Sequence, residues 1–406
     1  MIALLLALLL SPAETRGRQI FLQGTSASGR EVTPVFAGGP SPAPLACATC
    51  HGRDGRGRRE GGIRSANIEW DTLARASAIR PAYDDPRLRR AITMGIDAGG
   101  RRLDPAMPRY RLWRDDADDL VAWLRRLGTI GEPGVSDTTL RVRVAGTMSA
   151  VFQAWADAVN SRGGIYGRRI EIADDDDTFA LLGDPADDLT RRAVADEVPV
   201  VRAGTLDAIE GPWVFELGAA ASDEVKSLLE AAVANGVMPV AIPAGPFADL
   251  CLPPGCVRAD EVAAARAVLV LDARGMPPPG HVALVPSAIA GDALSHAQGD
   301  AYVAVRILPE DVDHEAASRY QLAGDHLVDQ WSALAVARLA ERALARAGRA
   351  LTREAFVQAL ESEHETPTGF SPPVTFDPNR HHGIGTVRIL RFEHQSGRLV
   401  RLSESP

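Results

Sequence analysis

The segment Cys47-Ala-Thr-Cys50-His51 holds two of the chain's four cysteines, with a histidine directly after the second one. This spacing lets two thiols add to the vinyl groups of a haem while the adjacent imidazole coordinates the iron from one face. A thioredoxin-like pair or half a zinc site has similar spacing, but the first needs a βαβ pattern and the second needs two further ligands. The surrounding sequence offers neither. It therefore predicts one covalent haem c, with its iron held by His51.

A six-coordinate haem iron needs a second axial ligand. Met107 follows about 55 residues later, within Pro105-Ala-Met-Pro-Arg-Tyr110, in an expected loop just before a helix. Methionine ligation raises the reduction potential relative to two histidines. Met94 is the alternative, but we expect it at a helix end and packed in the core. A second histidine is excluded, because His51 is the only one in this part of the chain.

The first part of the chain is predicted to consist of short helices separated by loops. The clearest helix, Asp115–Leu127, opens with acidic residues, which suit the positive helix end, and closes with Arg125 and Arg126. The Gly-, Ser- and Pro-rich stretch Gly24–Pro44 is expected to be a loop. The other expected helices, several with Asp or Pro at the start, are Arg16–Gln23, Asp71–Ile79 and Pro86–Met94.

In this order of elements, residues 15–128 resemble a class I cytochrome c. The resemblance is carried by Gly17-Arg-Gln-Ile-Phe21, the Cys47 to His51 motif, Met107-Pro108 and Trp123. It implies an all-α cytochrome c domain, to which we assign residues 14–128. It also implies that the small glycine lets the first and last helices cross closely, with aromatic side chains around the contact.

The N-terminus is predicted to be a signal peptide over residues 1–13. An apolar run, Met1–Leu10, ends at small residues, is too short to span a bilayer and lacks the usual basic start. A mis-assigned start codon or a buried helix are the alternatives. Cys251 and Cys256 bracket Leu-Pro-Pro-Gly, and a small disulfide between them suits an oxidising compartment. We therefore expect an exported, soluble periplasmic protein without a stable membrane span.

Length and charge both indicate two different domains. At 406 residues and 46% apolar content, the chain exceeds what one hydrophobic core usually supports. The net charge of -9 is uneven, because residues 14–133 carry about five more arginines than acids. This positive part could steer an acidic redox partner or lie against its acidic neighbour. We expect no binding of nucleic acid.

After an expected linker at residues 129–138, strand and helix patterns alternate, which predicts parallel α/β layers. The expected strands are Leu140–Ala145, Arg169–Ala173, Val198–Val201, Val237–Ile242 and His281–Val285, with an extended end at Thr386–Leu402. The expected helices are Ala150–Val159, Ser222–Ala234, Ala259–Ala273, Leu327–Ala347 and Thr352–Glu361.

Residues 139–406 resemble type I periplasmic binding proteins of the branched-chain amino-acid and urea transporter group. The passages Val144–Ala150, Ala158–Asp175 and Val374–Gly383 carry the resemblance. It implies an α/β domain of two lobes joined by a hinge, with a small molecule bound between them. The chain is short for this family between Asp177 and Pro199 and after Gly204, so one lobe is expected to be reduced.

Several further residues have both a functional and a structural interpretation. Thr147 and Ser149 could offer hydroxyl groups to a ligand or cap a turn. The run Asp174–Asp177 suggests a cation site but fits a solvated loop better, and His381-His382 point to opposite faces of a strand, so we treat them as structural. Trp70 and Tyr110 could line the haem crevice, although core packing would explain both.

The sequence therefore predicts an electron carrier and not an enzyme. Two protein ligands leave no open position on the iron, so peroxidase activity would require dissociation of Met107. The expected partner is a periplasmic dehydrogenase or an oxidase-side cytochrome, with the second domain docking that partner or recognising a small molecule. The alternative is a solute-binding component of an ABC-type transporter, or a sensor in which the haem reports redox state or ligand occupancy.

Overall fold

Two units make up the chain in the computed structural model, Met1–Pro133 and Gly134–Pro406. The structure describes residues 10–57, 59–60, 63–129, 131–206, 209–250, 256–320, 322 and 326–402. Residues 1–9 of the expected signal peptide and Cys251 of the expected disulfide lie outside these ranges. The signal peptide and the disulfide therefore stay predictions.

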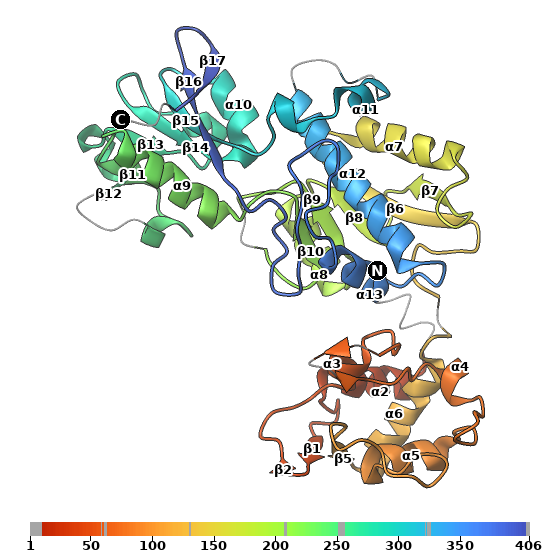
Figure 1. The fold of residues 1–406 in the computed structure, drawn as a ribbon. Coiled ribbons are helices and arrows are strands. Elements are labelled where there is room, and N and C mark those ends of the chain that lie inside the picture. The colour runs from red at the N-terminus through yellow and green to blue at the C-terminus, as the bar shows by residue number, and fades with distance from the viewer. Residues whose placement is uncertain are drawn as a thin grey trace. The chain divides into compact units, whose positions relative to one another are not determined.

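Short helices and two small antiparallel sheets form the first unit (Figure 1). The helices are α2 (Pro12–Gln23), α3 (Cys47–His51), α4 (Trp70–Leu73), α5 (Asp85–Met94) and α6 (Arg114–Arg126). One sheet has the order β2-β1-β5, from β1 (Thr33–Phe36), β2 (Gly39–Pro40) and β5 (Arg109–Arg111), and the other pairs β3 (Arg59–Glu60) with β4 (Ile63–Arg64). The stretch expected to be a loop, Gly24–Pro44, thus contains two strands.

The helix expected over Asp71–Ile79 is much shorter, because α4 ends at Leu73. The Arg80 guanidinium donates to the carbonyl oxygens of Thr72 at 2.9 Å and of Leu73 at 3.3 Å. These are carbonyl groups that another helical turn would have used. The Arg80 side chain therefore hydrogen-bonds the last carbonyl groups of α4, which backbone N–H groups would bind in a longer helix.

Helices α2 and α6 cross closely, as the resemblance to cytochrome c implies. A Cβ on Gly17 would lie 2.9 Å from Cβ of Trp123 and would collide with the backbone carbonyl of Asp119. The Arg16 guanidinium donates two hydrogen bonds of 2.6 and 2.8 Å to the Asp119 carboxylate. Phe21 packs against Trp123, with ring centroids 6.3 Å apart. Gly17 thus allows a helix contact that no larger residue permits.

A five-stranded parallel sheet forms the first lobe of the second unit. Its strands, in the order β10-β9-β8-β6-β7, are β6 (Thr139–Ala145), β7 (Arg169–Ile172), β8 (Ala180–Gly183), β9 (Val200–Arg202) and β10 (Val214–Glu216). The core on one face joins α7 (Ser149–Ser161), α12 (Leu327–Ala347) and α13 (Arg353–Glu361), and a second core lies under α8 (Asp187–Ala195). Every residue of β8, β9 and β10 is buried, as expected for strands covered on both faces.

The second lobe contains a seven-stranded sheet in the order β12-β11-β13-β14-β15-β16-β17. Its parallel strands are β11 (Val240–Ile242), β12 (Cys256–Arg258), β13 (Ala267–Leu269), β14 (Val282–Val285) and β15 (Ala301–Val305), followed by the antiparallel β16 (Arg388–Glu393) and β17 (Arg398–Arg401). Its helices α9 (Ala221–Ala234) and α10 (Ala290–Ser295) cover opposite faces.

A connection of the second lobe corrects one expectation. The helix expected over Ala259–Ala273 is a 3₁₀ turn, Ala259–Ala264, followed by β13. Both Arg266 and Ala267 donate their backbone N–H groups to Pro239, which brings the chain beside β11. The region from Asp177 to Pro199, in the first lobe, contains β8 and α8. Short 3₁₀ turns connect several strands of the second lobe.

Three chain segments cross between the two lobes of this unit, and they are bound to each other. The first follows β10, the second follows β15, and the third precedes β16. Ile384 in the third crossing donates its N–H to Leu217 in the first at 2.9 Å. Arg388 binds the carbonyl oxygen of Arg306 at 2.8 Å and the Asp311 carboxylate, both in the second crossing.

A buried ion pair joins the first-lobe strands to the third crossing. Arg202 in β9 is fully buried, and its Nε donates to the Glu216 carboxylate in β10 at 2.8 Å. His382 Nδ1 lies 3.5 Å from the other oxygen of that carboxylate, and Glu210 lies 3.8 Å from its Nε2. The interaction with Glu216 raises the pKa of His382, against the opposing effect of burial. A carboxylate inside the protein is thus shared by two cationic groups.

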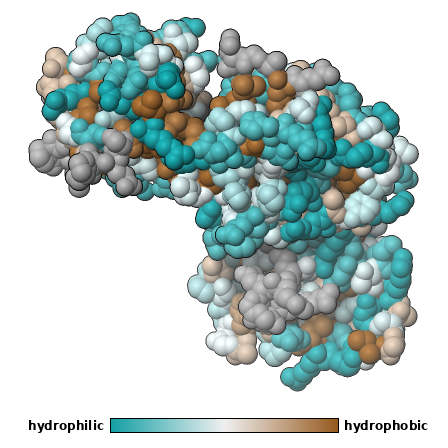
Figure 2. All heavy atoms as spheres, turned by 45° about the horizontal axis from the view of Figure 1, so that its top comes forward, coloured by the Kyte–Doolittle hydropathy of each residue, from teal (hydrophilic) through white to brown (hydrophobic). Residues whose placement is uncertain are grey.

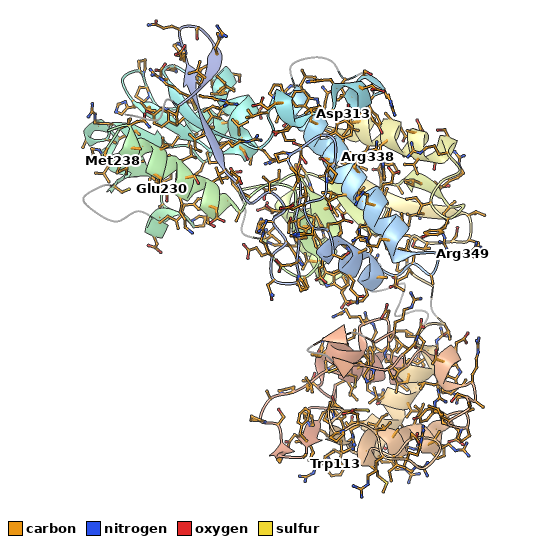
Figure 3. All side chains as sticks on the ribbon, in the orientation of Figure 1. Trp113, Glu230, Met238, Asp313, Arg338 and Arg349 are labelled. Carbon is orange, nitrogen blue, oxygen red and sulfur yellow. The ribbon has the colours of Figure 1, made fainter. Side chains whose placement is uncertain are left out.

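Figure 2 shows mainly hydrophilic residues on the drawn face, with hydrophobic residues gathered mostly in the lobe that holds β11–β15. Trp113, directly before α6, projects from the first unit (Figure 3) and is 62% exposed. The Arg30 guanidinium lies over its ring, 5.3 Å from the centroid. Within the described ranges, none of the helices has the length and apolar character needed to cross a bilayer.

Replacing Gly17 by alanine should destabilise the first unit, because the new methyl group must push α2 away from the backbone of α6. We expect a loss of at least about 1–3 kcal/mol in the free energy of unfolding, measured by urea denaturation. Gly38→Ala is the matched control, since no atom lies within 4 Å of its added Cβ. Equally small losses in both variants would contradict the role given to Gly17.

The raised pKa of His382 predicts that the second unit loses stability as the pH rises. The stabilising contribution of the protonated ring is complete below its ordinary pKa of 6.5 and disappears as the pH passes the raised pKa of the folded state. In His382→Gln this pH dependence should be weaker, as measured by thermal unfolding across neutral pH. His296→Gln, at an exposed position, is the control. Identical pH profiles for His382→Gln and the wild type would refute the prediction.

Candidate functional site

Helix α3 brings the two thiols and the imidazole of the sequence motif together. Cys47 and Cys50 are three positions apart within one helical turn, so their side chains leave the same side of the helix. Both cysteines are thiols and not half of a disulfide. His51 follows directly, at the last position of the helix. The motif therefore has the geometry needed for two thioether bonds to one flat group.

The orientation of His51 is set by a backbone group. Its Nδ1 lies 2.9 Å from the carbonyl oxygen of Ala66, so this nitrogen carries the proton and donates it. The tautomer leaves Nε2 with the lone pair that a metal ion requires. Burial lowers the pKa of His51, which keeps the ring neutral near neutral pH. The imidazole is therefore prepared to be a ligand through Nε2.

Tyr110 of β5 is buried beside the start of α3. Its hydroxyl group donates to the carbonyl oxygen of Leu45 at 3.1 Å. The same hydroxyl group also interacts with the Cys47 thiol. Burial raises the pKa of this thiol to about 12. A thiol with this pKa stays protonated at neutral pH. Tyr110 belongs to the buried core of the first unit, as the core-packing interpretation expects, and its role at the haem crevice stays a prediction.

The two candidate methionines lie in different environments. Met107 is half-buried in the loop before β5, and its carbonyl oxygen accepts a hydrogen bond from the Arg109 guanidinium. Met94 is the last residue of α5 and is 62% exposed, so the expectation that it packs in the core is wrong. Helix α5 ends in a left-handed residue, Gly95, which turns the chain just after Met94 and leaves this side chain outside.

A cavity of about 570 Å³ lies between the two lobes of the second unit. Residues that follow the carboxyl ends of the parallel strands form its wall, which is the usual ligand position in open α/β sheets. Asp184 and Thr205 contribute from the first lobe, Phe247 and Ser287 from the second, and Arg306 from the crossing after β15. The cavity wall therefore combines carboxyl groups, a guanidinium group, hydroxyl groups and an aromatic ring.

Arg306 contacts both lobes. Its Nη2 donates to the Ser287 hydroxyl at 3.2 Å and lies 3.5 Å from the carbonyl oxygen of Gly204. A Cβ on Gly204 would lie 3.0 Å from Nη2, and one on Gly218 would lie 2.8 Å from Nε. Nε is buried and has no hydrogen-bond partner in the described part of the chain. Two glycines thus leave room for the guanidinium at the cavity wall.

Asp184 lines the same cavity, directly after β8. The backbone N–H of Ala203 donates to its Oδ1 at 3.1 Å. Burial raises the pKa of Asp184, and the nearby Arg306 opposes this shift. Asp187 and Asp329 also reach the cavity wall, but they face Arg191 and His326 at 3.5 and 3.4 Å. Asp184 is therefore the acid most directly opposed to Arg306.

Comparison with known proteins supports the assignment of the first unit. Residues 36–128 match the family model described as Cytochrome c, a range that includes α3, His51 and Met107. This segment is a cytochrome c domain. Membership of that family implies covalently bound haem c, and haem in turn suggests electron transfer. No curated protein matches the chain.

The second unit has the α/β fold of type I periplasmic binding proteins. A possible leucine/isoleucine/valine-binding protein from Rhodopirellula baltica SH 1 is 16% identical, with a TM-score of 0.50, and the match covers 66% of this chain and 97% of that one. A branched-chain amino acid ABC transporter protein from Thermus thermophilus with bound valine is 17% identical, with a TM-score of 0.50 and coverage of 67% and 96%. At these identities the likeness establishes the fold alone. The chain is therefore a cytochrome c domain followed by a binding-protein fold.

The other candidate residues of the second unit lie at its surface. Thr147 lies exposed in the turn before α7, and Ser149 is the exposed first residue of that helix. Neither lines the cavity, so their ligand role stays a prediction. Asp175 and Asp177 both pair with Arg141 on the surface. This pairing supports the solvated-loop interpretation of the acidic run.

The adjacent histidines contact different neighbours, which confirms their structural interpretation. The His381 ring stacks on Phe215 with centroids 3.9 Å apart, whereas His382 faces Glu216. Among the described residues, no three or more His, Cys, Asp or Glu side chains gather as a metal site would require.

Sequence reasoning did not identify Asp184 or Arg306. Each is the first polar residue after a buried strand, β8 for Asp184 and β15 for Arg306. A search for charged residues directly after expected parallel strands would have found Arg306 if Ala301–Val305 had been recognised as a strand. It would have found Asp184 in the same way, because Ala180–Gly183 is equally apolar.

Proposed function

We propose that this chain is an exported periplasmic electron carrier with one haem c, attached through Cys47 and Cys50 and ligated by His51 and Met107. Each thiol adds across one vinyl group, so that a C–S bond forms and the thiol hydrogen passes to the vinyl carbon. When bound, the haem supplies a one-electron change at its iron. The observation that carries the proposal is the orientation of His51 within a matched cytochrome c domain.

The chain's own residues would hold and shield the group. Ala66 fixes the His51 tautomer, Tyr110 packs against the Cys47 side, and the Met107 loop provides a thioether from another segment. Two protein ligands favour electron transfer over peroxidase chemistry, because no iron position is left for substrate. The partner class we propose is a periplasmic dehydrogenase or an oxidase-side cytochrome.

The cavity supports a second activity, the binding of a small molecule between the lobes of the second unit. The Arg306 guanidinium on the cavity wall is suited to a carboxylate, and the Asp184 carboxyl is suited to an amine. The two similar structures are described as a possible binder of leucine, isoleucine or valine and as a protein with bound valine. An amino acid is therefore the ligand class to test. A solute-binding transporter component or a haem-containing sensor would use the same cavity.

The haem assignment predicts different outcomes for the two methionines. After export from cells equipped for c-type maturation, the protein should retain haem on a denaturing gel and show the methionine-to-iron absorption band. Met107→Ala should keep the covalent haem, lose the band and lower the reduction potential, while Met94→Ala should keep both band and potential. Cys50→Ala and His51→Ala should impair attachment. If the methionine-to-iron band persists in Met107→Ala, another methionine must be the ligand and the assignment to Met107 is wrong.

The cavity assignment predicts that Arg306 contributes to affinity for an amino acid. Calorimetric titration with leucine, isoleucine and valine should detect binding to the wild type. Loss of a charged hydrogen bond in Arg306→Ala should weaken that binding by about tenfold or more. Arg319→Ala removes a guanidinium that is exposed and pairs with Glu315 outside the cavity, so it is the control. Equal affinities for both variants would contradict the role of Arg306.

A further inference from the structure

Strand β5 is hydrogen-bonded through adjacent side chains to both segments that carry the proposed haem ligands. It pairs antiparallel with β1, with Val35 opposite Arg109 and Pro34 opposite Tyr110. Successive side chains on a strand point to opposite faces. The side chains of Arg109 and Tyr110 therefore contact different segments. Arg109 contacts the Met107 loop, and Tyr110 contacts the chain just before helix α3.

Arg109 binds backbone groups of the Met107 loop. Its Nη1 donates to the carbonyl oxygen of Met107, and its Nη2 donates to that of Leu103 at 3.0 Å. Leu103 in turn donates its N–H to Gly95 at 2.8 Å, at the end of α5. One guanidinium thus holds both ends of the turn from residue 103 to residue 107.

Gly95 provides the space in which the Arg109 side chain lies. Its φ is +66°, and a Cβ built there would overlap the Arg109 guanidinium. Many other arginines of this unit pair with carboxylates, for example Arg16 with Asp119 and Arg101 with Asp97. Within the described residues, the hydrogen bonds of the Arg109 side chain go to carbonyl oxygens instead. Arg109 therefore uses several N–H donors of one guanidinium group to hold the backbone of a loop.

Tyr110 connects the next position of the same strand to the other ligand segment. Its hydroxyl group holds the carbonyl oxygen of Leu45, two residues before Cys47. Tyr110 is 5% exposed, so this hydrogen bond is shielded from water. Through neighbouring residues, β5 is tied to the start of the attachment helix and to the methionine loop.

We propose that Arg109 is a positioning residue for the sixth haem ligand, because it fixes the Met107 loop on a strand that Tyr110 anchors to helix α3. The inference rests on the proposed ligation by Met107. Arg109 does not touch the iron and acts only through the backbone of the loop. Loss of its side chain should free Met107 to leave the iron while the thioether bonds and His51 stay in place.

The test compares Arg109→Ala, Arg109→Lys and Arg111→Ala as full-length, haem-loaded proteins. Arg111 is on the same strand and exposed, and is therefore the matched control. For Arg109→Ala we expect haem that stays attached on a denaturing gel, a weakened methionine-to-iron band, and binding of carbon monoxide to the reduced form at least about tenfold faster. Arg109→Lys should restore part of the band, since an ammonium group can still donate to a carbonyl oxygen.

The outcomes separate this inference from the proposed function. A methionine band in the wild type and in Arg111→Ala, with an equally strong band and equal carbon monoxide binding in Arg109→Ala, would overturn the role of Arg109 and leave the ligation by Met107 intact. A wild type with attached haem but no methionine band would instead overturn the ligation itself. If Arg109→Ala does not fold, a band that is as strong and as stable to alkaline pH in Arg109→Lys as in the wild type would count against the proposal.

Discussion

The contact between Gly17 and the backbone of α6 is the constraint on which the first unit depends. It brings together the first and last helices of a segment whose functional residues all lie between them in the sequence. Helix α2 also contacts α3, and a Cβ on Gly24 at its end would lie 2.7 Å from the carbonyl carbon of Leu45. At the other end, Trp70 donates its N–H to Leu127 just after α6. The helix pair therefore supports both the attachment helix and the chain that follows it.

The features that could be predicted from the sequence are those written in local patterns. The motif from Cys47 to His51, the helix Leu327–Ala347 and the general two-unit organisation follow from spacing and periodicity, and the structure contains them. Features that depend on distant partners could not be predicted. The exposure of Met94 has a local cause that the sequence analysis missed, because the left-handed Gly95 directly after it turns the chain. The contact of Arg306 with Ser287 depends on the fold, although its place directly after a buried strand can be read from the sequence.

The two candidate sites use different physical means. In the cytochrome c domain, backbone carbonyl groups do most of the orienting, with Ala66 on His51, Leu45 on Tyr110, and Met107 on its neighbouring arginine. Such contacts survive many side-chain substitutions, because every residue has a carbonyl group. The cavity of the second unit instead relies on charged side chains from several elements, and single substitutions there change its chemistry directly.

The three crossings between the lobes also have a mechanical consequence. A single connection would allow one lobe to rotate and twist freely against the other, whereas three connections that are hydrogen-bonded to each other remove most of those freedoms. What remains is bending about the line on which the crossings lie, so access to the cavity would change along one coordinate. Arg306 belongs to the second crossing, so a ligand bound by its guanidinium would lie next to the hinge axis and not at the opening of the cavity.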